Sequence, residues 1–141
     1  MIIWFFTIIF LILVTSNLLL ANNSYFEEGL NLFKSKEYLK AKFKFEQDIV
    51  FNPKSEMSYL YLSKIFNNLK KKELEEQNLN AVILLNPNNE EAIYNLAKLK
   101  LANSDYRKSK ELNDRLKQLC KKFCEKSQNL KIEIENLSNK K

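Results

Sequence analysis

Two Asn-Pro pairs, Asn52-Pro53 and Asn86-Pro87, recur with a 34-residue period and contain the only prolines of this 141-residue chain. Each pair follows an apolar run and precedes a polar, acidic segment. The residue before a proline avoids helical backbone, whereas proline itself suits the first turn of a helix. A fixed period of this length is typical of stacked helical units, which bury their apolar faces against one another. The spacing therefore predicts a helical repeat protein.

The composition favours helices over strands. All charged side chains lie after residue 21, so the formal net charge of +6 belongs to the remainder of the chain. That remainder is rich in Leu, Lys, Glu and Asn and has a single glycine, Gly29. Strands joined by tight turns need more Gly and Pro at the turns. We therefore predict an all-α fold.

Two absences from the sequence bear on function. There is no histidine, which removes His-based acid–base catalysis, Ser-His and Cys-His nucleophile pairs and histidine metal ligands. A single glycine cannot build a phosphate-binding loop. No pair of carboxylates stands in a context suited to acid–base catalysis. We expect no enzymatic activity, no catalytic residue, no cofactor and no metal site.

Residues 1–21 are almost wholly apolar and uncharged. Small residues at Ser16 and Ala21 are compatible with cleavage of a signal peptide, whereas the whole segment is nearly long enough to span a bilayer as an anchor. A buried helix of a soluble domain fits less well, because the segment is apolar on every face. Both main alternatives predict an exported protein, periplasmic or membrane-anchored and facing outside the cytoplasm.

Aligning residues 22–55, 56–89 and 90–123 gives columns of similar residues. One column is bulky, with Tyr25, Tyr59 and Ile93, and another is small, with Gly29, Ser63 and Ala97. Two helices of a hairpin approach closely only where one side chain is small, and bulky residues one turn away fill the space around that contact. The columns therefore predict three helical hairpins.

These residues resemble the tetratricopeptide repeat, whose pattern is W-x2-L-G-x2-Y, A-x3-F and P. The first copy is Tyr25-x2-Glu28-Gly29-x2-Leu32, Ala41-x3-Phe45 and Pro53. The second is Tyr59-x2-Leu62-Ser63-x2-Phe66, with Glu75, Leu79 and Pro87, and a weaker third holds Ile93-x2-Leu96-Ala97, Tyr106 and Ser109. The resemblance covers about residues 23–123 and implies a right-handed stack of three helical hairpins.

We expect helices near 23–36, 38–51, 54–68, 71–85, 88–103 and from 105 onward. The third copy lacks a closing proline, and its apolar stripe continues through Leu116 and Phe123 to Leu137. This predicts one extended C-terminal helix that caps the stack. The domain organisation is then a signal peptide or membrane anchor over 1–21, the repeat domain over 22–125, and a helical extension with a frayed tail over 126–141.

The resemblance implies that a peptide or helix binds in the groove lined by the first helix of each hairpin. The inward positions would be Phe26, Leu30, Phe33, Lys34, Leu60, Tyr61, Lys64, Asn67, Asn68, Tyr94, Asn95 and Lys98. The alternative is that the aromatic members belong to the hairpin cores and that the Asn residues have no role. One subfamily clamps the terminal carboxylate of a chaperone, at sites that here would be Phe26, Leu30, Tyr61, Glu91 and Asn95. Their chemistry does not fit that subfamily, because Glu91 would repel a carboxylate.

We therefore predict a non-enzymatic scaffold or adaptor with a protein or peptide partner. Nucleic acid is not expected, since the chain has only two arginines, and membrane association would run through residues 1–21. The oligomeric state is open, and the alternative function is a structural oligomer that self-associates through the long C-terminal helix. Cys120 and Cys124 share a helix face in this prediction, which favours a buried apolar pair and leaves an intermolecular disulfide as the alternative.

Overall fold

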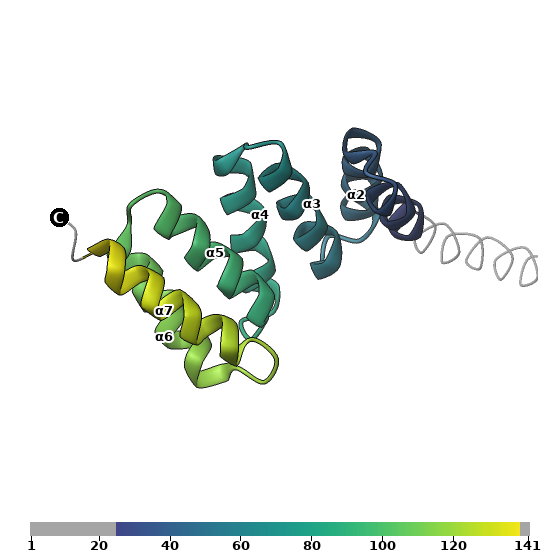
Figure 1. The fold of residues 1–141 in the computed structure, drawn as a ribbon. Coiled ribbons are helices and arrows are strands. Elements are labelled where there is room, and N and C mark those ends of the chain that lie inside the picture. Colours follow the sequence, from purple (N-terminus) through teal and green to yellow (C-terminus); the bar gives the residue numbers. More distant parts are fainter. Residues whose placement is uncertain (1–24, 139–141) are drawn as a thin grey trace, which may run out of the picture. The chain divides into compact units, whose positions relative to one another are not determined.

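The computed structural model describes residues 25–138, and helices are the only regular elements in this range. A helix over 25–34 is followed by α2 (Tyr38–Phe51), α3 (Glu56–Asn68), α4 (Lys72–Leu85), α5 (Glu90–Ala102), α6 (Tyr106–Leu119) and α7 (Cys124–Ser138) (Figure 1). The predicted all-α fold is confirmed. The predictions for residues 1–21, including an apolar N-terminal helix, and for the tail at 139–141 lie outside the described residues.

The period of the two Asn-Pro pairs governs the helix ends. The second helices of the hairpins, α2, α4 and α6, begin at Tyr38, Lys72 and Tyr106, each one full period after the last. The first helices α3, α5 and α7 begin at 56, 90 and 124 with the same spacing. The period thus continues past residue 123, and α7 occupies the place of the first helix of a fourth unit.

The turns within the three hairpins share one backbone geometry. Lys36, Lys70 and Ser104, which recur with the same period, have φ values of 61°, 56° and 61°. The N–H of the following residue returns to a carbonyl of the last turn, from Glu37 to Leu32, from Lys71 to Phe66 and from Asp105 to Lys100, each at 2.9 Å. This is the Schellman end of a helix, in which glycine usually takes the left-handed position. The chain uses lysine and serine there instead.

The described residues divide into two compact units, with the boundary between Ser58 and Tyr59. In the first unit the helix over 25–34 pairs with α2 around the single glycine. A Cβ atom on Gly29 would lie 2.9 Å from the Phe45 ring, so only glycine allows this approach. Phe45 and Ala41 are fully buried on α2. The small position of the first copy therefore makes the close contact that the sequence predicts.

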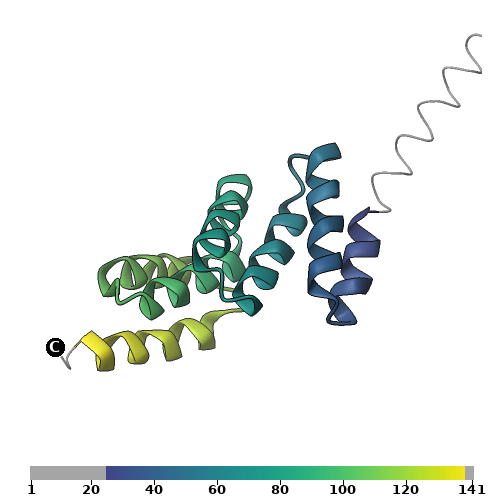
Figure 2. The same ribbon diagram turned by 90° about the horizontal axis from the view of Figure 1, so that it is seen from above.

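The second unit is built around α5, which packs against α4, α6 and α7 (Figure 2). The small column is again buried, with Ser63 on α3 and Ala97 on α5. Ser109 of α6 is fully buried and donates its hydroxyl to the Ala97 carbonyl at 2.8 Å. A larger residue at Ala97 or at Ser109 would separate α5 from α6.

The prediction of one extended C-terminal helix is wrong. The helix that starts at Tyr106 ends at Leu119, and α7 starts at Cys124. The predicted apolar stripe is divided between the two helices. Leu116, Leu130 and Ile134 join the core, whereas Leu137 at the end of α7 is exposed. Self-association through a continuous C-terminal stripe therefore loses its structural basis. The expectation that the last helix caps the stack holds for α7, which packs against α5 and α6.

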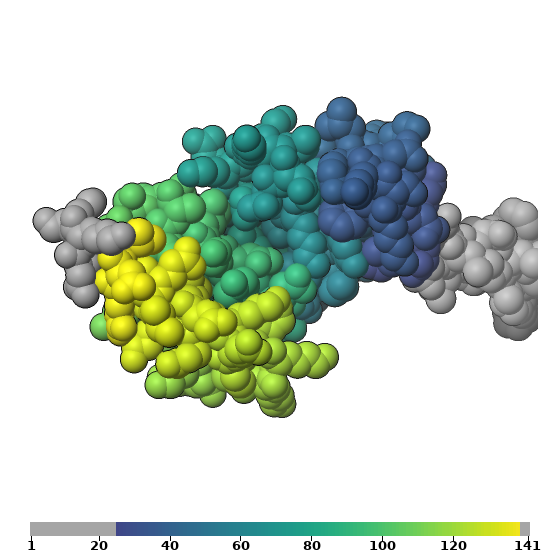
Figure 3. Space-filling model, viewed as in Figure 1, coloured from purple at the N-terminus to yellow at the C-terminus, as the bar shows by residue number. Residues whose placement is uncertain are grey.

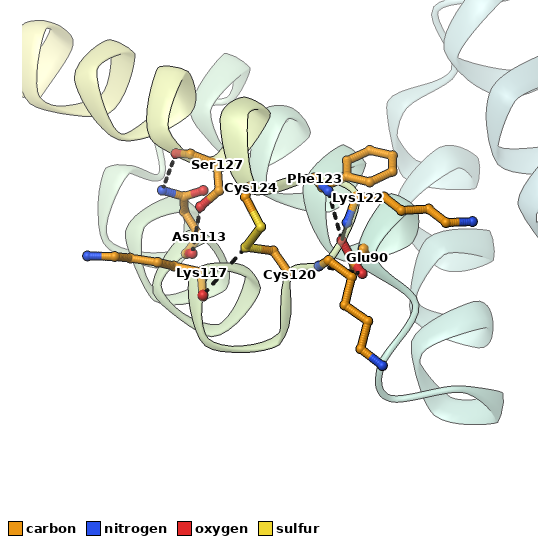
Figure 4. Close-up of a disulfide and its surroundings, with 9 residues drawn as sticks. Glu90, Asn113, Lys117, Cys120, Lys122, Phe123, Cys124 and Ser127 are labelled. Carbon is orange, nitrogen blue, oxygen red and sulfur yellow. Dashed lines mark hydrogen bonds between the residues drawn. A yellow bond between two sulfur atoms is a disulfide. The ribbon is translucent and has the colours of Figure 1, made fainter.

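We call the segments between hairpins, residues 86–89 and 120–123, the second and third seams. In both, the residue after the helix donates its N–H to the carbonyl four residues earlier, from Asn86 to Val82 and from Cys120 to Leu116, at 2.8 Å each. The third seam lacks Asn-Pro. Instead, Cys120 and Cys124 form a disulfide with a Cα–Cα distance of 5.2 Å (Figure 4). The prediction of a buried, unbonded cysteine pair on one helix is wrong, because the helix ends between them.

A glutamate of the preceding hairpin binds the third seam. The Glu90 carboxylate accepts the backbone N–H groups of Lys121, Lys122 and Phe123 at 3.0, 3.0 and 2.9 Å (Figure 4). Burial alone would raise the pKa of Glu90, but these three N–H groups and the charge of Lys121 outweigh it and lower the pKa. A further hydrogen bond joins α6 to α7, because Asn113 donates from Nδ2 to the Ser127 carbonyl at 3.0 Å.

Candidate functional site

The four predicted groove residues of the first unit have different environments. Phe26 lies against Phe45 with ring centroids 5.8 Å apart, and Phe33 lies against Tyr38 at 5.5 Å. Both rings are half-buried and pack within the hairpin, as the alternative interpretation expects. Leu30 is also half-buried, and Lys34 is exposed. The unit thus leaves Lys34 as the most accessible member of this set.

On α3 the structure separates the predicted residues. Leu60 is 2% exposed and belongs to the core, so it is not available to a ligand. Tyr61 and Lys64 are half-buried and in contact, with the Lys64 Nζ 4.8 Å from the centre of the Tyr61 ring. The same Nζ lies 2.8 Å from the carboxylate of Glu91 on α5. Tyr61, Lys64 and Glu91 therefore form one cluster across two first helices.

The two asparagines at the end of α3 make local bonds. Asn67 donates its amide to the Glu75 carboxylate of α4 at 3.0 Å, and Asn68 donates to the Lys64 carbonyl at 2.9 Å. Glu75 is buried where the repeat pattern has alanine. Burial raises the pKa of Glu75, although the Asn67 bond and the charge of Lys72 partly offset it. Asn67 is thus a hydrogen-bond donor to the buried carboxyl group of Glu75 in its own hairpin.

On α5 the C-terminal part of the chain contacts two of the three predicted residues, Tyr94 and Lys98. The Tyr94 ring packs against Phe123 at 5.6 Å between centroids, and the Lys126 Nζ lies 5.5 Å from the Tyr94 ring. Lys98 pairs with Glu133 of α7 at 3.2 Å. In the space-filling view α7, in yellow, lies over the green α5 and α6 (Figure 3). Asn95 is half-buried and lies one repeat after Tyr61.

The sequence does not predict the residues that contact Tyr94 and Lys98 of α5. Phe123, Lys126 and Glu133 follow the third hairpin, and one extended helix would not have brought them back onto α5. The repeat pattern assigns Glu91 only to a position of the carboxylate clamp and does not predict its ion pair with Lys64. The available signal was the period itself, because α7 starts one full period after α5.

We define the α3–α5 face as Tyr61, Lys64, Asn68, Glu91 and Asn95. It offers amide, ammonium and phenol donors beside one carboxylate acceptor, on two consecutive first helices of the second unit. Such a mixture of aromatic bodies and polar groups suits hydrogen bonding to a peptide. Within residues 25–138 no group of three or more His, Cys, Asp or Glu is placed to hold a metal ion. In the same range no helix has the length and apolarity needed to cross a membrane.

Comparison with solved structures shows that the fold is a stack of tetratricopeptide-repeat hairpins, which confirms the predicted resemblance. No protein-family model and no curated protein sequence matches the chain.

Three similar structures represent this class. One is the first TPR domain of Spaghetti (RPAP3) bound to an HSP90 peptide, with 19% identity and a TM-score of 0.75 over 84% of this chain and 93% of that one. Another is the TPR2B domain of yeast Sti1 in a complex with pHsp70, with 16% identity and a TM-score of 0.76 over 82% and 97%. A third is the Yersinia enterocolitica secretion chaperone SycD with a peptide of the translocator YopD, with 14% identity and a TM-score of 0.74 over 84% and 92%.

Proposed function

We propose that the chain is a non-enzymatic adaptor that binds an extended peptide or a helix of a protein partner on the α3–α5 face. The observation that carries this proposal is the Tyr61–Lys64–Glu91 cluster, which leaves aromatic and charged groups half-exposed on adjacent first helices. The three similar structures hold peptide or protein partners in the same fold, which supports the class of ligand.

The Lys64–Glu91 ion pair restricts the chemistry of the partner. Its two charges cancel, so a terminal carboxylate would meet Glu91 as well as Lys64 and gain little net attraction. A peptide segment that presents its amide groups fits better, since amides can bond to Asn95 and Asn68 without adding charge beside the ion pair. We therefore propose internal peptide segments as ligands, in place of free carboxyl termini.

A peptide library displayed on phage tests the proposal. Peptides selected on the full chain are synthesised and titrated against wild type and against the double variant Tyr61→Ala, Asn95→Ala. We expect a loss of affinity of roughly tenfold or more, which corresponds to about 1.4 kcal/mol, as for central residues of an interface.

The matched control is Glu111→Ala, Gln118→Ala on the exposed side of α6, which should bind the peptides with wild-type affinity. Equal binding by all three proteins would overturn the assignment of the α3–α5 face. Selected peptides that depend on a free carboxyl terminus would overturn the inferred ligand chemistry and leave the face intact.

We also propose that residues 1–21 direct the chain out of the cytoplasm or hold it in a membrane. This rests on the uncharged apolar sequence of the segment. The N-terminal mass of the protein from its native cell tests it. A start near residue 17 or 22 indicates a cleaved signal peptide, and an intact Met1 in the membrane fraction indicates an anchor. An intact Met1 in the soluble fraction would contradict both.

A further inference from the structure

The outward side of α2 carries a stripe of exposed apolar side chains. Leu39, Phe43 and Val50 are 70%, 57% and 74% exposed. At about 100° of rotation per residue they fall within roughly 40° of the helix circumference. The buried residues Ala41 and Phe45 lie on the other side of the helix. We call Leu39, Phe43 and Val50 the α2 stripe.

The repeat itself does not require this stripe. The equivalent positions on α4 are Glu73, Gln77 and Leu84, and those on α6 are Arg107, Glu111 and Gln118. The apolar character therefore falls from three residues to one and then to none along the chain, although all nine positions are exposed. Glu46, which pairs with Lys42, lies on this face between Phe43 and Val50. Exposed apolar side chains that gather on one face of a helix are typical of an interaction surface.

Basic residues accompany the stripe. The segment 36–54 contains five lysines and three acidic residues, and one of the acids, Asp48, is buried. Lys36 and Lys54 are exposed just beyond the two ends of α2. Within α2, Lys40 is exposed and pairs with Glu37. A helix that combines an exposed apolar stripe with nearby lysines matches the pattern of helices that lie in the interface of an anionic membrane. A second copy of α2 is disfavoured as the partner, because the two lysine sets would repel each other.

The sequence places this hairpin next to the apolar N-terminal segment. Only residues 22–24 separate residue 21 from the helix that begins the described chain. Four residue steps span at most about 14 Å. If residues 1–21 enter a bilayer, the first unit is therefore held within a short distance of its surface.

We infer that the α2 stripe docks on an anionic lipid surface, with Leu39, Phe43 and Val50 at the boundary of the acyl chains and the lysines among the headgroups. The inference deepens the proposed membrane attachment and rests on it. It gives the first hairpin a role distinct from that of the α3–α5 face, which belongs to the second unit.

Tryptophan quenching tests this docking. The chain has one tryptophan, Trp4, so the variant Trp4→Phe, Phe43→Trp carries its only indole on the stripe. The full chain is reconstituted into vesicles of phosphatidylglycerol and phosphatidylcholine with brominated acyl chains. We expect a blue shift and loss of most of the emission, and a smaller loss in vesicles of phosphatidylcholine alone.

The matched control is Trp4→Phe, Gln77→Trp, which places the indole at the same repeat position of α4 and should keep its emission. Equal emission from the two variants would overturn the docking of α2. A blue shift that depends on protein concentration and not on lipid would also overturn it, in favour of a second copy. Wild-type Trp4 reports separately on the N-terminal segment. Quenching of Trp4 without quenching at position 43 supports attachment and rejects docking, whereas the reverse supports docking and rejects attachment.

Discussion

The second and third seams each join a second helix to the next first helix, but different bonds stabilise the two turns. In the second seam Asn86 and Asn89 cap the turn, since the Asn86 side chain accepts the N–H of Asn88 at 3.1 Å and the Asn89 side chain accepts the N–H of Ala92 at 2.8 Å. The third seam has neither asparagine. Its N–H groups bond to Glu90, and its ends are joined by the Cys120–Cys124 disulfide.

The repeat is therefore defined by its columns of buried residues, and Asn-Pro marks only some of its boundaries. Leu130 of α7 lies one full period after Leu96 of α5, and both are buried in the core. For Leu130 to occupy that position, the chain must turn between α6 and α7. Bonds other than those of Asn-Pro can stabilise this turn. Four changes test this comparison.

The largest effect is expected from Leu130→Ala, which deletes a fully buried side chain and should destabilise the protein by about 3 kcal/mol. Urea unfolding measures it. Ile132→Ala, on the exposed side of the same helix, is the control and should cost less than about 0.5 kcal/mol. Similar effects of the two variants would mean that α7 does not continue the repeat.

The disulfide should rank next. Its closed loop is short, so the entropic estimate for the double variant Cys120→Ser, Cys124→Ser is a loss of about 2 kcal/mol. Thermal unfolding with and without dithiothreitol measures this loss. The reductant should lower the midpoint of wild type and leave the double variant unchanged. A wild-type midpoint insensitive to the reductant would contradict the role given to the disulfide.

Pro87→Ala should have a smaller effect, because the second seam keeps its asparagine caps. The added freedom of the unfolded chain predicts a loss of about 0.5 to 1 kcal/mol. Equilibrium unfolding in urea measures it against the cysteine double variant. A loss larger than that of the cysteine variant would show that proline, and not capping, holds the second seam.

Glu90→Gln should give the smallest and most pH-dependent effect. The folded-state pKa of Glu90 is lowered, so its ionised carboxylate stabilises the fold above the unfolded pKa, near pH 4.3, and this contribution disappears as the pH falls through the lowered folded value. The stability difference between wild type and variant should be constant from pH 7 to about pH 5 and shrink in more acid solution. A difference that persists unchanged at the lowest pH would exclude the carboxylate as the acceptor of the seam.

Much of the fold was predictable because it depends on local pattern. Helices near 38–51 and 71–85 follow from the columns and from Asn-Pro, and their observed ends agree within one residue. The turn at Cys120 was not predictable in the same way, since no proline or glycine marks it. To predict this turn, one must assume that the 34-residue period continues after Leu119, although Asn-Pro is absent there.

The candidate site was less predictable than the fold. Helical position alone does not distinguish Leu60, which is buried, from Tyr61, which is half-exposed beside it. The repeat pattern predicts Tyr94 as a groove residue, yet Phe123 packs against it because the chain turns back at the third seam. Accessibility at these positions depends on contacts between distant segments, whereas the core columns repeat locally. The assignment of the twelve groove residues as a binding site stays a prediction.

The central claim is that α6 and α7 are separate helices joined by a bonded seam. Backbone chemical shifts of residues 106–138, with amide exchange in the same sample, test it most directly. The account predicts helical shifts over Tyr106–Leu119 and Cys124–Ser138, non-helical shifts at 120–123, and slowed exchange of the Lys121, Lys122 and Phe123 amides that bond to Glu90. Unbroken helical shifts from residue 106 to residue 138 would contradict it.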